Sequence, residues 1–232
     1  MSFLSKLKSF NNKLQAETSS GRFGISRTDR QLAALFGSTA KMTIIIIDCS
    51  GSMCCTDYPP NRLEAAINAA IEYVNTLKGQ SVKATAAVIS FSDEAKVIVP
   101  PTAINNSREI IKGIRSIKIE GTTNIGNGFK QATKVLTNYS GLNNQSQIIL
   151  LTDGDGDCPL SIPEKLKQQY GTTIDVVGIG GSPVDVNESL LRKVATTELD
   201  GTNHYRFIAD ARTLKQHYSK LATGLVWKGD NQ

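Results

Sequence analysis

The sequence predicts an α/β protein with a doubly wound, mostly parallel sheet of six strands, one antiparallel edge strand and helices on both faces. Short β-branched runs such as residues 42–47 (MTIIII) are typical of strands that are buried on both faces. Segments with apolar residues at helical spacing alternate with these runs. A tight polar break at residues 92–94 joins two β-rich runs, which predicts a hairpin and hence the antiparallel strand.

The first forty residues differ from the rest of the chain. Phe3, Leu7, Phe10 and Leu14 share one helical face, so residues 3–16 are predicted to form an amphipathic helix. A polar, Gly/Ser-rich linker follows at residues 17–30. We expect a basic N-terminal helical arm and linker over residues 1–40, an α/β domain over 41–226 and a C-terminal tail over 227–232.

The elements of the domain are predicted from run length and from start and stop signals. Ser107 is predicted to cap one helix and Asn187 another, and Gly171 follows the end of a third. The predicted strands are residues 42–48, 83–91, 95–100, 145–155, 172–180 and 204–210, and the predicted helices are 61–79, 107–117, 124–139, 163–170, 187–197 and 211–226.

The charge is distributed unevenly along the chain. Residues 1–41 hold seven Lys or Arg and two acidic residues, whereas residues 42–232 hold 19 of each, so the net charge of +5 belongs to the arm. A neutral body with a basic arm is not typical of a nucleic-acid-binding protein, and none is expected as a partner. No apolar run approaches the length of a membrane span, and the N-terminus lacks the apolar region of a secretory signal. We therefore expect a cytoplasmic protein without a transmembrane segment.

Four cysteines, Cys49, Cys54, Cys55 and Cys158, fall in two predicted loops. Their spacing is not that of a zinc site, and free thiols are the expectation for a chain without a secretory signal. Because the two loops are neighbours in the predicted sheet, Cys158 could approach Cys54 or Cys55. Redox control of the adjoining site is a hypothesis that follows from this.

Polar side chains gather where buried strands end. Asp48, Ser50 and Ser52 alternate at the end of the first strand, and Asp153 lies at the end of the fourth. Sites in such sheets form at the carboxyl ends of the strands. Magnesium prefers oxygen ligands in octahedral geometry, and hydroxyls with carboxylates match that preference.

These residues carry a resemblance to a known family. Residues 48–53 (DCSGSM) resemble the D-x-S-x-S motif of the von Willebrand factor type A domain, which has a metal-ion-dependent adhesion site built from three loops. Residues 121–126 (GTTNIG) resemble the second loop, with Thr123 as the matching threonine and Thr122 where a second glycine is usual. Residues 148–154 (IILLTDG) resemble the third, so Asp153 matches. The resemblance covers about residues 40–225 and implies the Rossmann-like fold of this family.

The resemblance implies a complete metal-ion-dependent adhesion site and a function. Ser50, Ser52 and Thr123 would bind Mg²⁺ or Mn²⁺ directly, and Asp48 and Asp153 would hold it directly or through water. A Glu or Asp of a protein partner would complete the coordination shell. Stand-alone bacterial members of the family are encoded in stress-response and tellurite-resistance clusters, so we expect a metal-dependent protein-interaction module of a cytosolic multiprotein stress-response or regulatory system. We expect the predicted N-terminal helix to pack on the domain; docking to a partner or to an anionic membrane is the alternative.

Three alternatives compete with this interpretation. A metal-dependent hydrolase or phosphatase could use the same residues, but no histidine or lysine pairs with them by motif, so we expect no catalytic residue and no enzyme. Calcium could bind Asp153, Asp155, Asp157 and Glu164 at EF-hand spacing, but Cys158 stands where that loop needs glycine. The domain could also bind partners without a metal, as some members of the family do.

Overall fold

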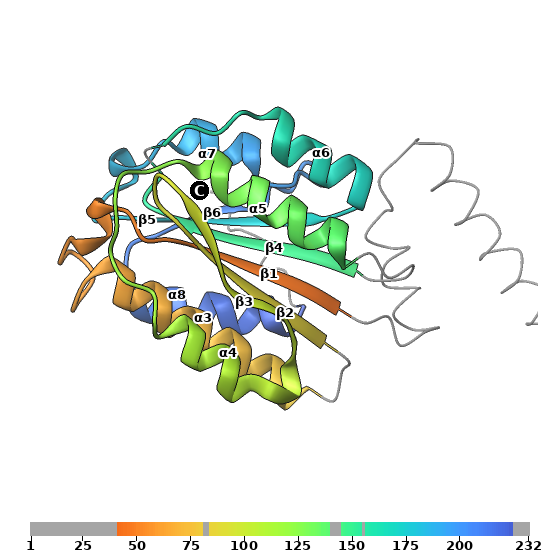
Figure 1. Ribbon diagram of the computed structural model, residues 1–232. Coiled ribbons are helices and arrows are strands. Elements are labelled where there is room, and N and C mark those ends of the chain that lie inside the picture. Colours follow the sequence, from red (N-terminus) through yellow and green to blue (C-terminus); the bar gives the residue numbers. More distant parts are fainter. Residues whose placement is uncertain (1–40, 81–83, 140–144, 155, 225–232) are drawn as a thin grey trace, which may run out of the picture.

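The computed structural model describes residues 41–80, 84–139, 145–154 and 156–224, so the predicted arm and tail lie outside the described residues (Figure 1). The strands are β1 (Lys41–Asp48), β2 (Ala84–Phe91), β3 (Ala95–Ala103), β4 (Gln145–Thr152), β5 (Thr173–Ile179) and β6 (Tyr205–Ile208). The helices are α3 (Arg62–Gly79), α4 (Ser107–Ile114), α5 (Ile125–Asn138), α6 (Ser161–Tyr170), α7 (Glu188–Val194) and α8 (Ala211–Ala222). Three short 3₁₀ turns are η1 (Gly51–Cys54), η2 (Ile104–Asn106) and η3 (Pro183–Asp185).

The six strands form one sheet in the order β3-β2-β1-β4-β5-β6. Every neighbouring pair is parallel except β2 and β3, which are antiparallel and joined by the short turn that was predicted. The predicted fold class is therefore confirmed. The chain first moves outward from β1 to β2 and later returns to the other side of β1 with β4. The carboxyl ends of β1 and β4 thus form the switch point of the sheet, where ligand sites of such folds lie.

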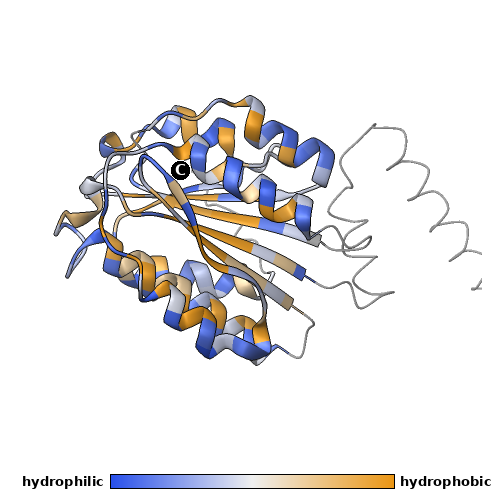
Figure 2. Cartoon of the chain, viewed as in Figure 1, coloured by the Kyte–Doolittle hydropathy of each residue, from blue (hydrophilic) through white to orange (hydrophobic). Residues whose placement is uncertain are grey.

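The sheet separates two hydrophobic cores, and β1 contributes to both. Ile45 and Ile47 belong to the core that contains the buried residues of α3, α4 and α8, whereas Ile44 and Ile46 belong to the core with α5, α6 and α7. This follows from the two-residue period of a strand. Figure 1 shows the two helical layers, and Figure 2 shows hydrophobic strands between helices whose polar residues face outward. Each buried isoleucine stabilises the fold by about 1.5–3 kcal/mol, which fixes the position of β1.

Most helix starts follow the capping chemistry of the sequence. The Asn61 and Asn187 side chains accept hydrogen bonds from the Glu64 and Leu190 amides, at 2.8 and 3.1 Å. Gly171 ends α6 in the left-handed conformation with φ of 58°. The prediction that Ser107 is an N-cap is wrong. Ser107 has helical angles (φ −51°, ψ −29°) and is the first residue of α4, because the turn η2 leads directly into the helix.

The two edges of the sheet differ from its centre. On β3 the pairing with β2 shifts register between Ala86 and Val88, opposite Pro100 and Pro101, which lack amide donors. The other edge, β6, has four residues and pairs with β5 alone.

Within the described ranges, none of the helices combines the length and apolarity needed to cross a bilayer.

Candidate metal site

Asp48 is the last residue of β1, and its carboxylate is fully buried. The Ser50 amide donates to Oδ1 at 2.9 Å, and the Thr152 hydroxyl donates to Oδ2 at 2.6 Å. Burial raises the pKa of Asp48 to about 6, and these hydrogen bonds oppose the rise. The Thr152 hydroxyl also accepts from the Gly154 amide at 2.9 Å, so one side chain links the ends of β1 and β4. The carboxylate is therefore held in one orientation at the switch point of the sheet.

Ser50 and Ser52 place their hydroxyls beside each other, with the two Oγ atoms 3.2 Å apart. Ser50 precedes η1, but its side chain does not cap that turn. Ser50 is buried, whereas Ser52 is exposed, so the pair opens toward solvent. Two ligands at right angles around a magnesium ion, each about 2.1 Å from it, lie about 3 Å apart. The observed separation matches that requirement.

The loop with Thr123 lies against the loop that follows β1. The Gly51 amide donates to the Gly121 carbonyl at 3.1 Å, and the Glu120 amide donates to the Cys49 carbonyl at 2.7 Å. Gly121 has φ of 50°, and a Cβ there would lie 2.0 Å from Asp93 Oδ1, so only glycine fits this close approach. These contacts bring the loop that contains Thr123 beside Ser50 and Ser52.

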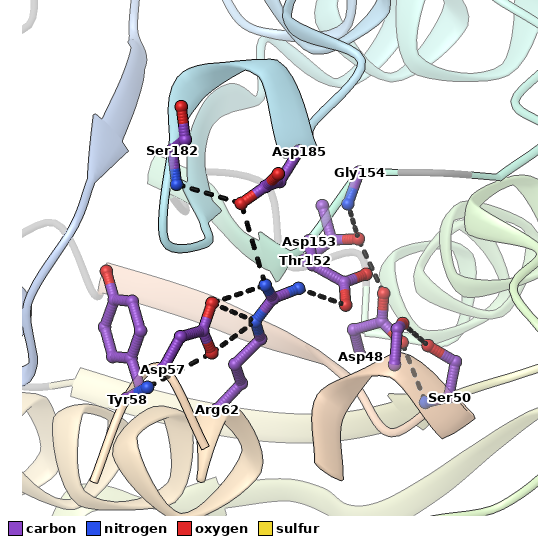
Figure 3. A network of polar contacts seen from close by, with 11 residues as sticks. Asp48, Ser50, Asp57, Tyr58, Arg62, Thr152, Asp153, Gly154, Ser182 and Asp185 are labelled. Atoms are coloured by element: carbon purple, nitrogen blue, oxygen red, sulfur yellow. Dashed lines mark hydrogen bonds and ion pairs between the residues drawn. The ribbon is translucent and has the colours of Figure 1, made fainter. Parts of the chain in front are cut away.

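Asp153 follows β4 and is buried, with 3% of its surface exposed. Its Oδ2 atom accepts a hydrogen bond from Nη1 of Arg62 at 3.1 Å. Its Oδ1 atom is buried and has no hydrogen-bond partner within the part of the chain that the structure describes. Figure 3 shows Asp153 between Asp48 on one side and the Arg62 guanidinium on the other. A buried carboxylate oxygen without a donor is costly, and a cation is the group that would satisfy it.

The donor set fits a hard divalent cation. The predicted ligands are the hydroxyls of Ser50, Ser52 and Thr123 and the carboxylates of Asp48 and Asp153, and oxygen-only sets suit Mg²⁺ or Mn²⁺. Among the described residues, no group of three or more His, Cys, Asp or Glu side chains could hold a metal ion. A metal at this edge of the sheet would therefore need hydroxyl ligands beside the carboxylates.

The remaining sequence hypotheses lie elsewhere. All four cysteines are free thiols, and Cys158 is buried in the core beneath α5 and α6, whereas Cys54 and Cys55 are exposed. The EF-hand alternative needs Asp155, which lies outside the described residues. The ring of His204 lies 2.9 Å from Asp175 Oδ1 and 3.2 Å from Glu198 Oε1, beside the start of β6, at the opposite end of the strands from the site.

Two residues that contact predicted ligands were missed by sequence reasoning: Thr152, which donates to Asp48, and Arg62, which donates to Asp153. Thr152 could have been found, because β1 and β4 pair in register and Thr152 lies beside Asp48. Arg62 resembled an ordinary helix residue. Its position in the first turn of α3 could have indicated its role. A positive charge there interacts unfavourably with the helix dipole, which indicates that another group stabilises it.

The chain is similar in sequence and fold to one known family of domains. Residues 43–155 match the model of the von Willebrand factor type A domain family. The family match and the structural neighbours support a protein with a von Willebrand factor type A domain, which is generally a metal-dependent protein-interaction module.

Two bacterial relatives and one solved structure illustrate the similarity. The uncharacterized protein YfbK of Escherichia coli is 30% identical over 73% of this chain and 28% of its own length. A UPF0353 protein of Mycolicibacterium paratuberculosis is 26% identical over 82% of this chain and 62% of its own length. The chain thus spans less than two thirds of these relatives. Proximal thread matrix protein 1 of the mussel byssus, solved with a zinc-occupied MIDAS motif, has a TM-score of 0.64 at 22% identity, over 81% of this chain and 48% of that one.

Proposed function

We propose that this domain binds Mg²⁺ or Mn²⁺ through Ser50, Ser52, Thr123, Asp48 and Asp153, and that the ion binds an acidic side chain of a protein partner. The observation that carries the proposal is the buried Oδ1 of Asp153, which lacks a hydrogen-bond partner among the described residues and lies at the same edge of the sheet as the paired serine hydroxyls. Neutral hydroxyl ligands would not neutralise the charge of the bound ion, so the ion would keep a positive charge for the partner. Proximal thread matrix protein 1 of the mussel byssus, which has a similar fold and was solved with a zinc-occupied MIDAS motif, supports this assignment.

The surface around the site supports a protein as the partner. Among the described residues, four large hydrophobic side chains are exposed, and three of them lie at the carboxyl edge of the sheet: Ile119 and Leu160 in loops and Val184 in the turn η3. Val184 is 88% exposed. Protein interfaces combine apolar contacts with polar ones. We infer that the partner presents an acidic side chain flanked by apolar ones.

We also propose that the domain is not catalytic and acts in the cytoplasm, in a bacterial stress-response or regulatory complex. The placement of His204 between two carboxylates away from the site, and of His217 on α8, supports a non-catalytic role. Both relatives named above are bacterial proteins, which supports a bacterial setting. Cell fractionation tests the location. Metal-dependent hydrolysis of p-nitrophenyl phosphate that is lost in Thr123→Ala would replace the proposal with a phosphatase.

The decisive experiment measures the ion and the partner separately. Titration calorimetry with Mg²⁺ or Mn²⁺ compares the wild type with Thr123→Ala and with the matched control Thr122→Ala, which changes the exposed neighbouring threonine. We expect Thr123→Ala alone to lose binding. A pull-down from native lysate, with magnesium or with EDTA, then asks whether a protein is retained only by metal-loaded wild type and control. Equal metal binding by all three proteins would contradict the assignment of Thr123.

A further inference from the structure

Arg62, the first residue of α3, lies among three carboxylates next to the proposed metal site. Its Nε donates to the two carboxylate oxygens of Asp57 at 2.9 and 3.0 Å, and its Nη1 donates to Asp153 at 3.1 Å. Its Nη2 lies 4.0 Å from Oδ2 of Asp185. The Arg62 side chain is 9% exposed. Figure 3 shows the guanidinium between these groups, which come from three different loops.

The guanidinium is fixed rather than free to swing into solvent. Asp57 holds it from the loop before α3, and the hydrogen bond from Arg62 lowers the pKa of Asp57, which keeps that carboxylate charged. Asp185 is itself oriented by the Ser182 amide, which donates to it at 2.9 Å. A planar guanidinium with several partners keeps one geometry, and it stays charged at every physiological pH. The positive charge near Asp153 is therefore permanent.

Arg62 engages the same carboxylate that the proposed ion would use. Oδ2 of Asp153 accepts from Arg62, while Oδ1 has no donor among the described residues. Without an ion, Arg62 is the cation that makes a buried Asp153 tolerable beside Asp48. If the divalent ion binds Oδ1, the ion and the Arg62 guanidinium share the Asp153 carboxylate. The two positive charges then repel each other.

We propose that Arg62 competes with the divalent ion for Asp153 and thereby sets the metal affinity of the site. This rests on the proposed function, because it assumes that the ion binds there. Arg62 is a positioning residue that stabilises the ion-free domain and weakens the binding of the ion. The consequence is a site that stays assembled without metal and releases it readily.

The test compares Mg²⁺ affinity by calorimetry and the rise of the melting temperature on adding Mg²⁺. The variants are Arg62→Gln, which removes the charge, and Arg62→Lys, which keeps it. Arg192→Gln is the matched control, since Arg192 forms an exposed ion pair with Glu188 within α7. We expect Arg62→Gln to bind Mg²⁺ about tenfold more tightly, a usual size for coupling between two groups at one site. The control should stay close to the wild type, and Arg62→Lys, which keeps the charge but not the planar guanidinium, should change less than Arg62→Gln.

The melting temperature separates competition from loss of structure. In EDTA, Arg62→Gln should melt below the wild type, and with saturating Mg²⁺ the difference should shrink. If Arg62→Gln alone does not fold, the double variant Arg62→Gln with Asp57→Asn removes one charge of each sign and should still bind Mg²⁺ more tightly than the wild type. Equal or weaker binding by the folded variant would overturn the competition while leaving the metal site intact. Absence of Mg²⁺ and Mn²⁺ binding in every protein would overturn the proposed function itself.

Discussion

Thr152 offers the sharpest test of how the site is built. Its hydroxyl donates to Asp48 at 2.6 Å and accepts from the Gly154 amide at 2.9 Å, and the residue is fully buried. Thr152→Val keeps the shape of the side chain and removes both hydrogen bonds. A hydrogen bond to a charged group contributes about 1.5–3 kcal/mol, and a buried amide left without its acceptor costs about 1–3 kcal/mol. We therefore expect the free energy of unfolding to fall by about 2.5–6 kcal/mol.

The measurement is urea unfolding followed by circular dichroism, in EDTA and above the pKa of Asp48 of about 6, so that the carboxylate is charged. Thr152→Ser is the control, because it keeps the hydroxyl and loses only one methyl group, which costs about 0.5–1.5 kcal/mol. The slope of the transition should not change, since the exposed surface is the same. If the valine variant were as stable as the serine variant, the hydroxyl would not be what holds Asp48.

Three further predictions follow from close contacts and from burial. A Cβ at Gly156 would lie 2.7 Å from Thr123 Cγ2, so Gly156→Ala should weaken Mg²⁺ binding about tenfold or more in calorimetry, while Gly79→Ala, with no atom within 4 Å, should not. A Cβ at Gly113 would lie 2.2 Å from Val99 Cγ2, so Gly113→Ala should cost about 1–3 kcal/mol in urea unfolding. Burial and the nearby Arg206 lower the pKa of His217 to about 4, so only the unfolded chain takes up its proton as the pH falls below 6.5. Stability present above that pH is lost on acidification. His217→Gln should remove about 2 kcal/mol of the loss between about pH 7 and about pH 5, and an unchanged pH profile would contradict the burial of His217.

The sequence predicts the architecture well because its strands are strongly marked. Residues 42–47 can satisfy two cores at once only if both faces of the strand are covered, which the structure confirms. Asn61 and Asn187 cap their helices as local chemistry requires. Ser107 does not cap its helix, because the turn η2 before it is already helical. No residue pattern predicted that this turn would be helical.

The site is less predictable than the fold for a physical reason. Residues that follow a strand, such as Asp48 and Asp153, are visible because strand ends converge at one edge of the sheet. Arg62 reaches Asp153 from a position 91 residues away in the chain, and the interaction depends on the exact entry of α3. Tertiary packing sets this contact, so periodicity and motifs do not indicate it. The one indication in the sequence is the unfavourable position of the Arg62 charge at the start of a helix.

The shape of the sheet edges has a consequence for how this protein can meet others. Pro100 and Pro101 interrupt the outer ladder of β3, and β6 offers only four residues of backbone. Neither edge is a good template for adding a strand from another chain, and both features guard a sheet against growth into fibrils. Contacts made by extending the sheet are thus disfavoured, and association is left to loops and side chains. A domain of this kind can be concentrated in an assembly without its core strands becoming the means by which copies stick together.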